Sequence, residues 1–331
     1  LRWLGSLLAV TGALALAFTP AFWSQTGGGG TLPATLVIAL TIAAVIGTLA
    51  VSLSRRPYIA LAVALVVFGV IFATQIGTAR SLRFTVLASA WLIFLLTRAL
   101  LLTNPRPDGP PPARLDAQNR AGIFLILALG VVNDPLFVLF LPAVVLALSQ
   151  SRARIRWWHW AILAGVLALG IFGVVNEYYD PRWWAVTAER AVRLNGRDIP
   201  FLIASGWRNP ARWMDLFNFI TSQFTLIGLA LGALGLARLT RWYPVLGVTT
   251  LLAYAAFFAF GLAYYGADRP VLLLPMLTLQ GMWITYAVHT FSDWLEKTVA
   301  PANKAMVRQV AQVAYILLPA LLLWNIAGSV A

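Results

Sequence analysis

Residues 121–149 read AGIFLILALGVVNDPLFVLFLPAVVLALS, an apolar run that is interrupted at its centre by Asn133-Asp134-Pro135. Proline lacks the backbone donor that a helix interior needs, and a carboxylate at membrane depth is costly unless it is paired or hydrated. Each apolar half is about a dozen residues, or roughly 18 Å of helix, which reaches the middle of a ~30 Å hydrocarbon core without crossing it. The stretch therefore predicts a re-entrant hairpin or a broken helix. The alternative is a proline-kinked span with Asp134 beside a water-filled crevice.

The composition is typical of a polytopic membrane protein. Of the 331 residues, 60% are hydrophobic and 11% are charged, and the mean hydropathy is +0.82. The chain has no cysteine, which excludes disulfides and thiolate sites. His159 and His289 lie in separate segments, and no phosphate-cradling nucleotide motif is present. We therefore expect neither a metal nor a bound cofactor.

The charge is strongly basic, with 24 Lys and Arg against 11 Asp and Glu and a net charge of +13. Nearly all of the cations are arginines, and they punctuate the apolar spans. In this arrangement they are determinants of topology that face anionic lipid. The expected partners are thus membrane lipids rather than nucleic acid.

A proline-rich linker at residues 103–120 divides the chain into two halves. Residues 1–102 form an N-terminal half, and residues 121–331 form a C-terminal half that contains a long polar, extramembrane interfacial loop at residues 176–217. The apolar stretches predict spans at 4–23, 32–53, 57–76, 84–102, 157–175, 218–237, 243–265, 270–288 and 309–327. We expect an all-α, polytopic integral membrane helical bundle of about nine to eleven transmembrane segments, one of them broken or re-entrant.

The distribution of cations favours the re-entrant arrangement. If residues 121–149 enter and return on one face, that face collects most of the arginines in the short loops, whereas the opposite short loops keep Arg80, Arg83 and Arg269. The positive-inside rule then places the N-terminus and the linker in the cytoplasm. It places residues 176–217 and the Asp268-Arg269 turn outside, with nine spans and one hairpin in total.

Within the external loop, Asp180-Pro181 is a good N-cap and first-turn pair for a helix over Arg182–Leu194. The arginines of this segment fall on one helical face and its tryptophans fall on the other. Such a helix lies flat on a membrane interface.

Few polar residues are available for chemistry. The candidate catalytic acids are Asp134 in the interrupted stretch and Glu177 and Asp180 just outside a span. The candidate substrate-binding residues are Arg182, Gln223, Asp268 and Arg269. A carboxylate near an arginine at the mouth of a membrane cavity can act as a base while the arginine holds a phosphate.

Each candidate also has a structural interpretation. Asp180 is adequately explained as a helix cap, and Asp268-Arg269 as an ordinary loop pair. Gln223 is explained by a bond to another helix, and Gly228, Gly232 and Gly235 by a packing face of small residues.

Three stretches resemble one family. They are Ala17-Phe18-Thr19-Pro20-Ala21-Phe22-Trp23-Ser24-Gln25, then Gly130-Val131-Val132-Asn133-Asp134-Pro135 followed by Leu141-Pro142-Ala143, and residues 223–236. They resemble the protein-O-mannosyltransferase-like bacterial branch of the GT-C glycosyltransferase superfamily, which is catalogued as a domain of unknown function. Asp134 stands where that family more often has His.

The resemblance implies sugar transfer from a polyprenyl-phosphate donor on the extracytoplasmic face of a bacterial cytoplasmic membrane. Members of the family carry an external loop with an acidic motif before the Phe-Trp-Ser-Gln stretch, whereas this chain begins after that point. It also has glycines where the family tends to show an acidic residue and a tyrosine after Ser-Gln. If the sequence is complete, the resemblance implies a truncated or catalytically dead member.

Two other function classes stay open. One is a non-catalytic structural or accessory subunit that packs against other subunits of a larger membrane complex. A transporter is the weaker third hypothesis, because it needs paired broken helices in two related halves. The sequence shows no convincing second break.

Overall fold

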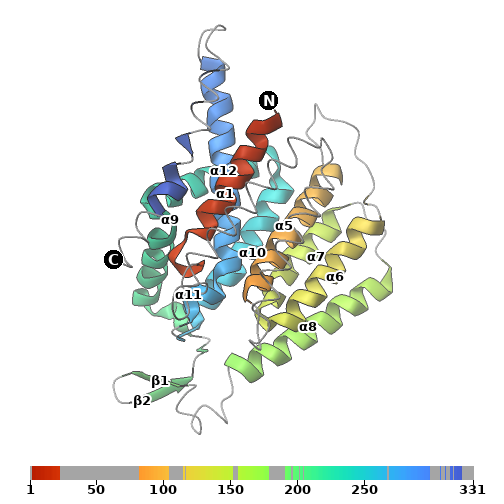
Figure 1. Cartoon of the computed structure of the whole chain (residues 1–331). Coiled ribbons are helices and arrows are strands. Elements are labelled where there is room, and N and C mark those ends of the chain that lie inside the picture. Colours follow the sequence, from red (N-terminus) through yellow and green to blue (C-terminus); the bar gives the residue numbers. More distant parts are fainter. Residues whose placement is uncertain are drawn as a thin grey trace, which may run out of the picture. The chain divides into compact units, whose positions relative to one another are not determined.

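The computed structural model describes residues 2–22, 82–103, 115, 117–151, 156–178, 191–194, 197–200, 202–203, 205–266, 268–298, 306, 310, 314–315 and 317–322. These residues are helical apart from one short β-hairpin (Figure 1). The helices are α1 (Arg2–Ala17), α5 (Leu82–Thr103), α6 (Ala117–Asn133), η1 (Pro135–Phe140), α7 (Leu141–Gln150), α8 (Trp157–Tyr178), η3 (Gly206–Arg208), α9 (Pro210–Trp242), α10 (Pro244–Ala263), α11 (Arg269–Leu272) and α12 (Leu274–Thr298), and the strands are β1 (Ala191–Leu194) and β2 (Arg197–Pro200).

The chain forms two compact units. One comprises Leu1–Arg80 and Val288–Ala331, and the other comprises Ser81–Ala287. The second unit contains α5, the helices from α6 to α11 and α12 as far as Ala287, and the contacts described below lie in it. Helix α6 begins at Ala117, inside the stretch predicted as linker.

Four of the described helices are long and apolar enough to cross a membrane. They are Thr85–Thr103, Trp157–Val175, Pro210–Trp242 and Pro244–Ala263. Each overlaps a predicted span, although Pro210–Trp242 begins before the span predicted at 218–237, so the all-α fold is confirmed and the four helices are consistent with a membrane protein. The spans predicted at 32–53 and 57–76, and most of 309–327, lie outside the described residues.

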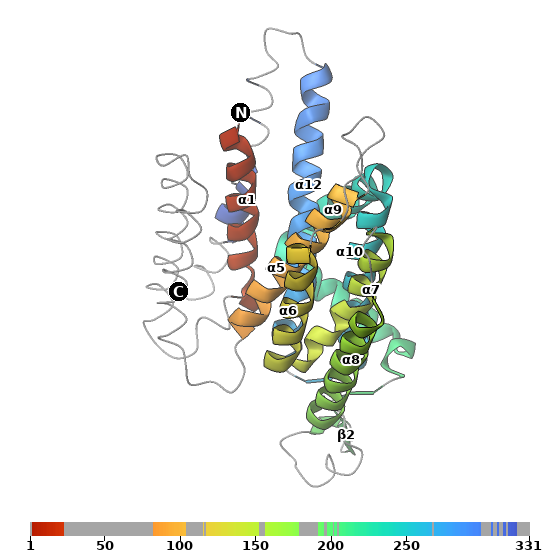
Figure 2. The same ribbon diagram turned by 90° about the vertical axis from the view of Figure 1, so that its right-hand side faces the viewer.

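The chain reverses direction at Asp134, as the interrupted stretch predicts. Helix α8 packs alongside α6 in the same direction, because the ring of His159 lies 5.2 Å from that of Phe124, while Gly173 lies against Pro135. The connection from Ser151 to Arg156 can span only about 18 Å when extended, so η1 and α7 must return toward the start of α8. Figures 1 and 2 show α6 and α8 side by side, with α5 next to α6.

Local chemistry sets the point of reversal. The residue before a proline is pushed out of the helical region, and Asp134 has φ −145° and ψ 109°. Its side chain then accepts a hydrogen bond from the Leu136 N–H, which caps η1. The two arms are longer than the dozen residues expected, because α6 has 17 residues and η1–α7 has 16. At 1.5 Å per residue, a fully α-helical segment of this length would be about 24–26 Å long.

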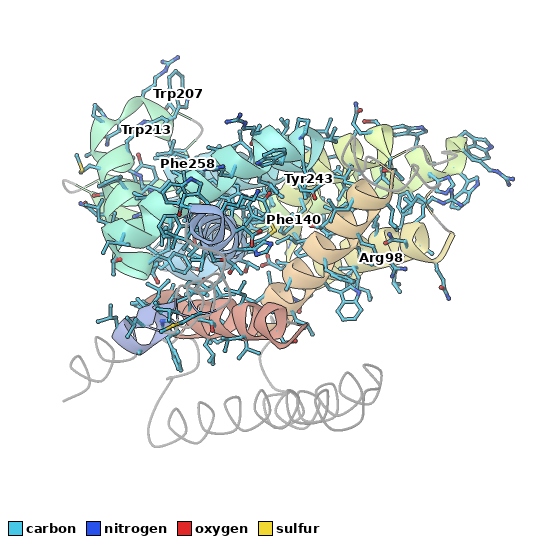
Figure 3. All side chains as sticks on the ribbon, turned by 90° about the horizontal axis from the view of Figure 1, so that it is seen from above. Arg98, Phe140, Trp207, Trp213, Tyr243 and Phe258 are labelled. Carbon is cyan, nitrogen blue, oxygen red and sulfur yellow. The ribbon has the colours of Figure 1, made fainter. Side chains whose placement is uncertain are left out.

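Three glycines let the reversed segment pack closely. A β-carbon on Gly130 would meet the ring of Phe137, one on Gly170 would meet Val138, and one on Gly173 would lie 2.6 Å from Pro135. Beyond them the core is aromatic, with the ring of Phe140 lying 4.9 Å from Phe137 and 5.0 Å from Phe257 of α10. Figure 3 shows Phe140 in the midst of the described side chains.

The glycine face on α9 is confirmed as a packing surface. A β-carbon on Gly235 would overlap the backbone of Trp283, one on Gly232 would displace the Gln280 amide, and one on Gly228 would lie 3.6 Å from Ile284. All three partners are on α12. This half of α9 is therefore held close to α12 by residues that no larger side chain can replace without movement.

Helix α9 is itself broken at Thr225, which has φ 64° and ψ 170°. This is the only non-glycine residue with positive φ in the described part of the chain. The sequence around it, Gln223-Phe224-Thr225-Leu226-Ile227, contains neither proline nor glycine and reads as an ordinary apolar helix. A second break therefore exists, contrary to the sequence analysis.

The predicted interfacial helix over Arg182–Leu194 is wrong at its C-terminal end. Ala191–Leu194 form β1, which pairs antiparallel with β2 in the register Leu194 to Arg197 and Ala191 to Pro200. The physical reason is visible in the sequence, because Asn195-Gly196 is the strongest two-residue hairpin signal. Residues 182–190 lie outside the described residues.

Candidate functional site

The C-terminus of α10 is the centre of the candidate site. The last carbonyls of a helix have no partner within the helix and carry its negative partial charge. Here Phe260 O accepts from Tyr264 N at 2.8 Å, and Ala263 O accepts from Ile203 N at 2.9 Å. The two carbonyls between them, those of Gly261 and Leu262, accept from a side chain of another helix.

That side chain is Arg212, in the first turn of α9. Its Nη2 donates to Gly261 O at 3.0 Å and also to Tyr264 O, and its Nε donates to Leu262 O at 3.3 Å. The guanidinium also lies 4.1 Å from the centre of the Tyr265 ring, a cation–π contact. Arg212 is only 9% exposed. It therefore ties the start of α9 to the end of α10.

Local sequence explains why α9 starts there. The Asn209 side chain accepts from Ala211 N at 3.0 Å, and Pro210 occupies the first turn, where its missing N–H costs nothing. Gly206 lies directly against the Leu262 carbonyl, where a β-carbon would not fit. The end of the 176–217 excursion and the Asp268-Arg269 turn thus meet at one end of the helices, as expected if both lie on one side of a membrane.

Arg269 begins α11 beside Arg212 and is the unusual member of the site. Its Nη1 is buried and has no hydrogen-bond partner among the described residues. Burial and then the positive charge of Arg212 lower the pKa of Arg269, whereas the carboxylate of Asp215 raises it. A buried guanidinium nitrogen without an acceptor, close to a second guanidinium, is a site that an anion would stabilise. We call Arg212 and Arg269 the arginine pair.

The acidic groups near the arginine pair differ in their surroundings. Asp268 accepts a 2.6 Å hydrogen bond from the Tyr264 hydroxyl, so its carboxylate is held by the turn. Asp215 is exposed, lies one helical turn after Arg212, and acts electrostatically on Arg269. Asp268 is exposed as well, but the Tyr264 hydroxyl already occupies one of its oxygens, which leaves Asp215 the more available carboxylate for a bound molecule.

Aromatic and apolar side chains border the site on the exposed side of α9. Trp213 donates from Nε1 to Trp207 O at 2.7 Å, and its ring lies 5.6 Å from that of Phe258. Figure 3 shows Trp207, Trp213 and Phe258 gathered at one edge of the helices. Met214 and Phe217 are 59% and 45% exposed. In a bilayer, this surface would contact acyl or prenyl chains.

Asp134 is placed as a structural residue. It is 1% exposed, and its carboxylate accepts from Leu136 N at 3.1 Å and from the Thr85 hydroxyl at 3.3 Å. Asn133 donates to the same hydroxyl at 3.0 Å. These bonds join the reversal point to the start of α5. A residue so enclosed has no access to a substrate in this conformation.

Among the other predicted site residues, only Asp134 and Gln223 have side chains that the structure describes, and neither lies at the arginine pair. Gln223 is buried near the break in α9 and donates to Ser222 Oγ at 3.0 Å. Glu177 lies in the last turn of α8, and the structure describes only its backbone. Asp180 and Arg182 lie outside the described residues. Of the predicted residues whose side chains the structure describes, Asp268 and Arg269 belong to the site.

Sequence analysis missed Arg212, and it counted Asp215 among the outward-facing polar residues without selecting it as a candidate. The available signal was an arginine followed by an acid three residues later, at the start of an aromatic stretch that leads into a span. As for metals, the part of the chain that the structure describes holds no group of three or more His, Asp or Glu arranged to bind an ion.

Comparison with known proteins finds no family model, no curated protein and no solved structure that matches this chain. The GT-C resemblance therefore stays a prediction from the sequence, and function is argued from the site.

Proposed function

We propose that this chain is a GT-C-like membrane protein that binds the phosphate of a polyprenyl-phosphate sugar at the arginine pair. The observation that carries the proposal is the buried Nη1 of Arg269, which has no acceptor among the described residues, while the positive charge of Arg212 acts on the same guanidinium. Guanidinium groups prefer phosphate and carboxylate oxygens, which accept paired, charge-assisted hydrogen bonds.

The surroundings of the arginine pair favour a lipid phosphate over a soluble one. Exposed apolar side chains of α9, among them Met214 and Phe217, continue directly from the site toward the middle of the helix. A polyprenyl phosphate has the matching combination, a charged head on a long apolar chain. The proposed topology is nine spans and one hairpin with a cytoplasmic N-terminus, which puts the site on the extracytoplasmic face of a bacterial cytoplasmic membrane.

In the proposed reaction, Asp215 is the candidate base. An acceptor hydroxyl oxygen would attack the anomeric carbon of the sugar, while its proton passes to the Asp215 carboxylate. The bond between the anomeric carbon and the phosphate oxygen would break, and its electron pair would leave with the polyprenyl phosphate. Arg269 would stabilise the negative charge that develops on that phosphate.

The test begins with binding. The protein in nanodiscs is titrated with polyprenyl phosphate, with polyprenol and with inorganic phosphate, and bound lipid is counted by native mass spectrometry. We expect binding of polyprenyl phosphate and a loss of about 10- to 100-fold in affinity for Arg269→Gln, since a charge-assisted hydrogen bond contributes roughly 1.5–3 kcal/mol. Polyprenol should bind weakly, and inorganic phosphate should bind more weakly than the lipid.

Arg208→Gln is the matched control, because Arg208 is an exposed arginine in η3, just before α9, and its guanidinium lies over the Trp207 ring. Equal affinities of the two variants and the native protein would refute the site. Glycosyl transfer is then assayed with Asp215→Asn. Full transfer by this variant would remove Asp215 as the base while leaving the binding site intact.

A second candidate function is the non-catalytic accessory subunit, and the burial of Asp134 favours it. The acid in the interrupted stretch is 1% exposed and caps η1, so it requires no chemistry to explain it. Gentle extraction from native membranes followed by intact mass spectrometry separates the two functions. A stoichiometric complex without transfer activity supports the subunit, whereas a chain that runs alone and transfers sugar supports the enzyme.

A further inference from the structure

The two halves of α9 are held by different partners. The N-terminal half, from Pro210 to Phe224, is tied to the C-terminus of α10 by the guanidinium of Arg212. The C-terminal half, from Leu226 to Trp242, is fixed on α12 through its glycine face. The break at Thr225 separates these two attachments.

Two features of Thr225 have opposite effects on the stability of the break. Its hydroxyl accepts a long hydrogen bond, 3.4 Å, from Gly228 N, three residues on, which is the pattern of an N-cap for the second half of the helix. Its φ of 64° and ψ of 170°, however, belong to a region that essentially only glycine occupies. The capping bond favours the break, and the β-carbon of Thr225 opposes it.

A continuous α9 would remove the strain at Thr225, but it would separate the N-terminal half from its attachment on α10. Residues 221–229 have apolar or small polar side chains that are compatible with a helix, and no proline prevents the hydrogen bonds. Turning φ of Thr225 from 64° to about −63° would rotate everything that precedes it relative to the half held by α12. The guanidinium of Arg212 would then leave the α10 carbonyls.

We propose that Thr225 is a joint at which α9 exchanges between the broken form and a continuous helix, and that the broken form is the one that assembles the arginine pair. The identity of the ligand is the one part of this proposal that rests on the proposed function. A phosphate that binds at the arginine pair would select the broken form. The existence of the joint itself rests on the backbone of α9.

The chain has no cysteine of its own, so two spin labels can be attached at introduced cysteines. Pulsed electron–electron double resonance then measures the distance between them. One label replaces Asn218 and the other replaces Leu234, both of which are exposed. A continuous helix would separate the two positions by about 24 Å along its axis, and the broken form by less. Labels at Ile227 and Arg241, both in the C-terminal half and both exposed, give the control distance.

Substitutions at Thr225 should move the distances in opposite directions. Thr225→Ala removes the cap and keeps a β-carbon, so it should enrich the longer distance. Thr225→Gly removes the β-carbon, so it should enrich the shorter one. The ratio of the two populations should differ about fivefold or more between the variants, which is the ratio that the helix preference of alanine over glycine implies. The control distance should not change.

Polyprenyl phosphate, added to the doubly labelled protein that keeps Thr225, should enrich the shorter distance between the labels. The Thr225→Ala variant should bind the lipid more weakly than the Thr225→Gly variant. Identical distance distributions for the three proteins, or a shift of both variants in the same direction, would overturn the joint. If the distances respond to the substitutions but no variant binds the lipid, then the proposed function fails and the joint stands. If the lipid binds but leaves the distances unchanged, the coupling between joint and site is refuted.

Discussion

Replacing Asp134 by alanine should destabilise the second unit by removing two hydrogen bonds from a buried place. The carboxylate of Asp134 accepts from Leu136 N at 3.1 Å and from the Thr85 hydroxyl at 3.3 Å, and the residue is 1% exposed. Loss of an N-cap costs about 1 kcal/mol, and a buried donor left unsatisfied costs about 1–3 kcal/mol. We expect a loss of about 2–3 kcal/mol of unfolding free energy.

The matched variant is Asp134→Asn, which keeps an acceptor oxygen for Leu136 N and a similar side-chain volume. Its expected cost is under about 1 kcal/mol, because the cap survives. Both variants are unfolded by denaturant titration in detergent micelles, with intrinsic tryptophan fluorescence as the signal. We also expect Asp134→Asn to bind polyprenyl phosphate normally. An alanine variant within about 0.5 kcal/mol of the native protein would refute the capping role, and a transfer activity lost in Asp134→Asn at full stability would restore Asp134 as a catalytic acid.

Three further predictions follow from the packing and from the topology. In α8, Gly173→Ala should be destabilising by about 1–3 kcal/mol in a thermal unfolding assay, because its β-carbon would lie 2.6 Å from Pro135. The matched variant Gly165→Ala, whose β-carbon meets no atom within 4 Å, should be stabilising by up to about 1 kcal/mol in that assay. Arg212→Met should cost about 2–3 kcal/mol, since the carbonyls of Gly261 and Leu262 lose their donor, and equal stability of the two proteins would show that water replaces the guanidinium without loss. A single cysteine at Ser205 should react with a membrane-impermeant maleimide from outside intact cells and one at Arg241 only after the cells are opened, whereas the reverse pattern would invert the topology.

The reversal at Asp134 could be predicted from the sequence because its causes are local. Pro135 prevents the helix from continuing, and the preceding Asp134 can cap the next turn, so two adjacent residues carry the information. The hairpin at residues 191–200 was equally local, since Asn195-Gly196 specifies it. It was missed because the arginine and tryptophan spacing of the neighbouring residues suggested a helix.

The candidate site depended on contacts that no local pattern records. Arg212 meets Gly261 and Leu262, which are 49 and 50 residues away, and its role exists only because the end of α10 lies against the start of α9. Arg269 was noticed as a cation beside an acid, but the burial of its Nη1 is a property of the packed turn. The break at Thr225 has no proline or glycine to mark it, and the tertiary attachments of the two halves of α9 decide it.

The central claim is that a lipid phosphate contacts the guanidinium of Arg269. Solid-state NMR tests it directly, through the dipolar coupling between ³¹P of bound polyprenyl phosphate and arginines labelled with ¹⁵N in their guanidinium groups. The account predicts a clear dephasing of the ³¹P signal in the native protein and in Arg208→Gln, and a loss of most of it in Arg269→Lys, whose single ammonium is not ¹⁵N-labelled. Undiminished dephasing in Arg269→Lys would place the phosphate at other arginines and contradict the account.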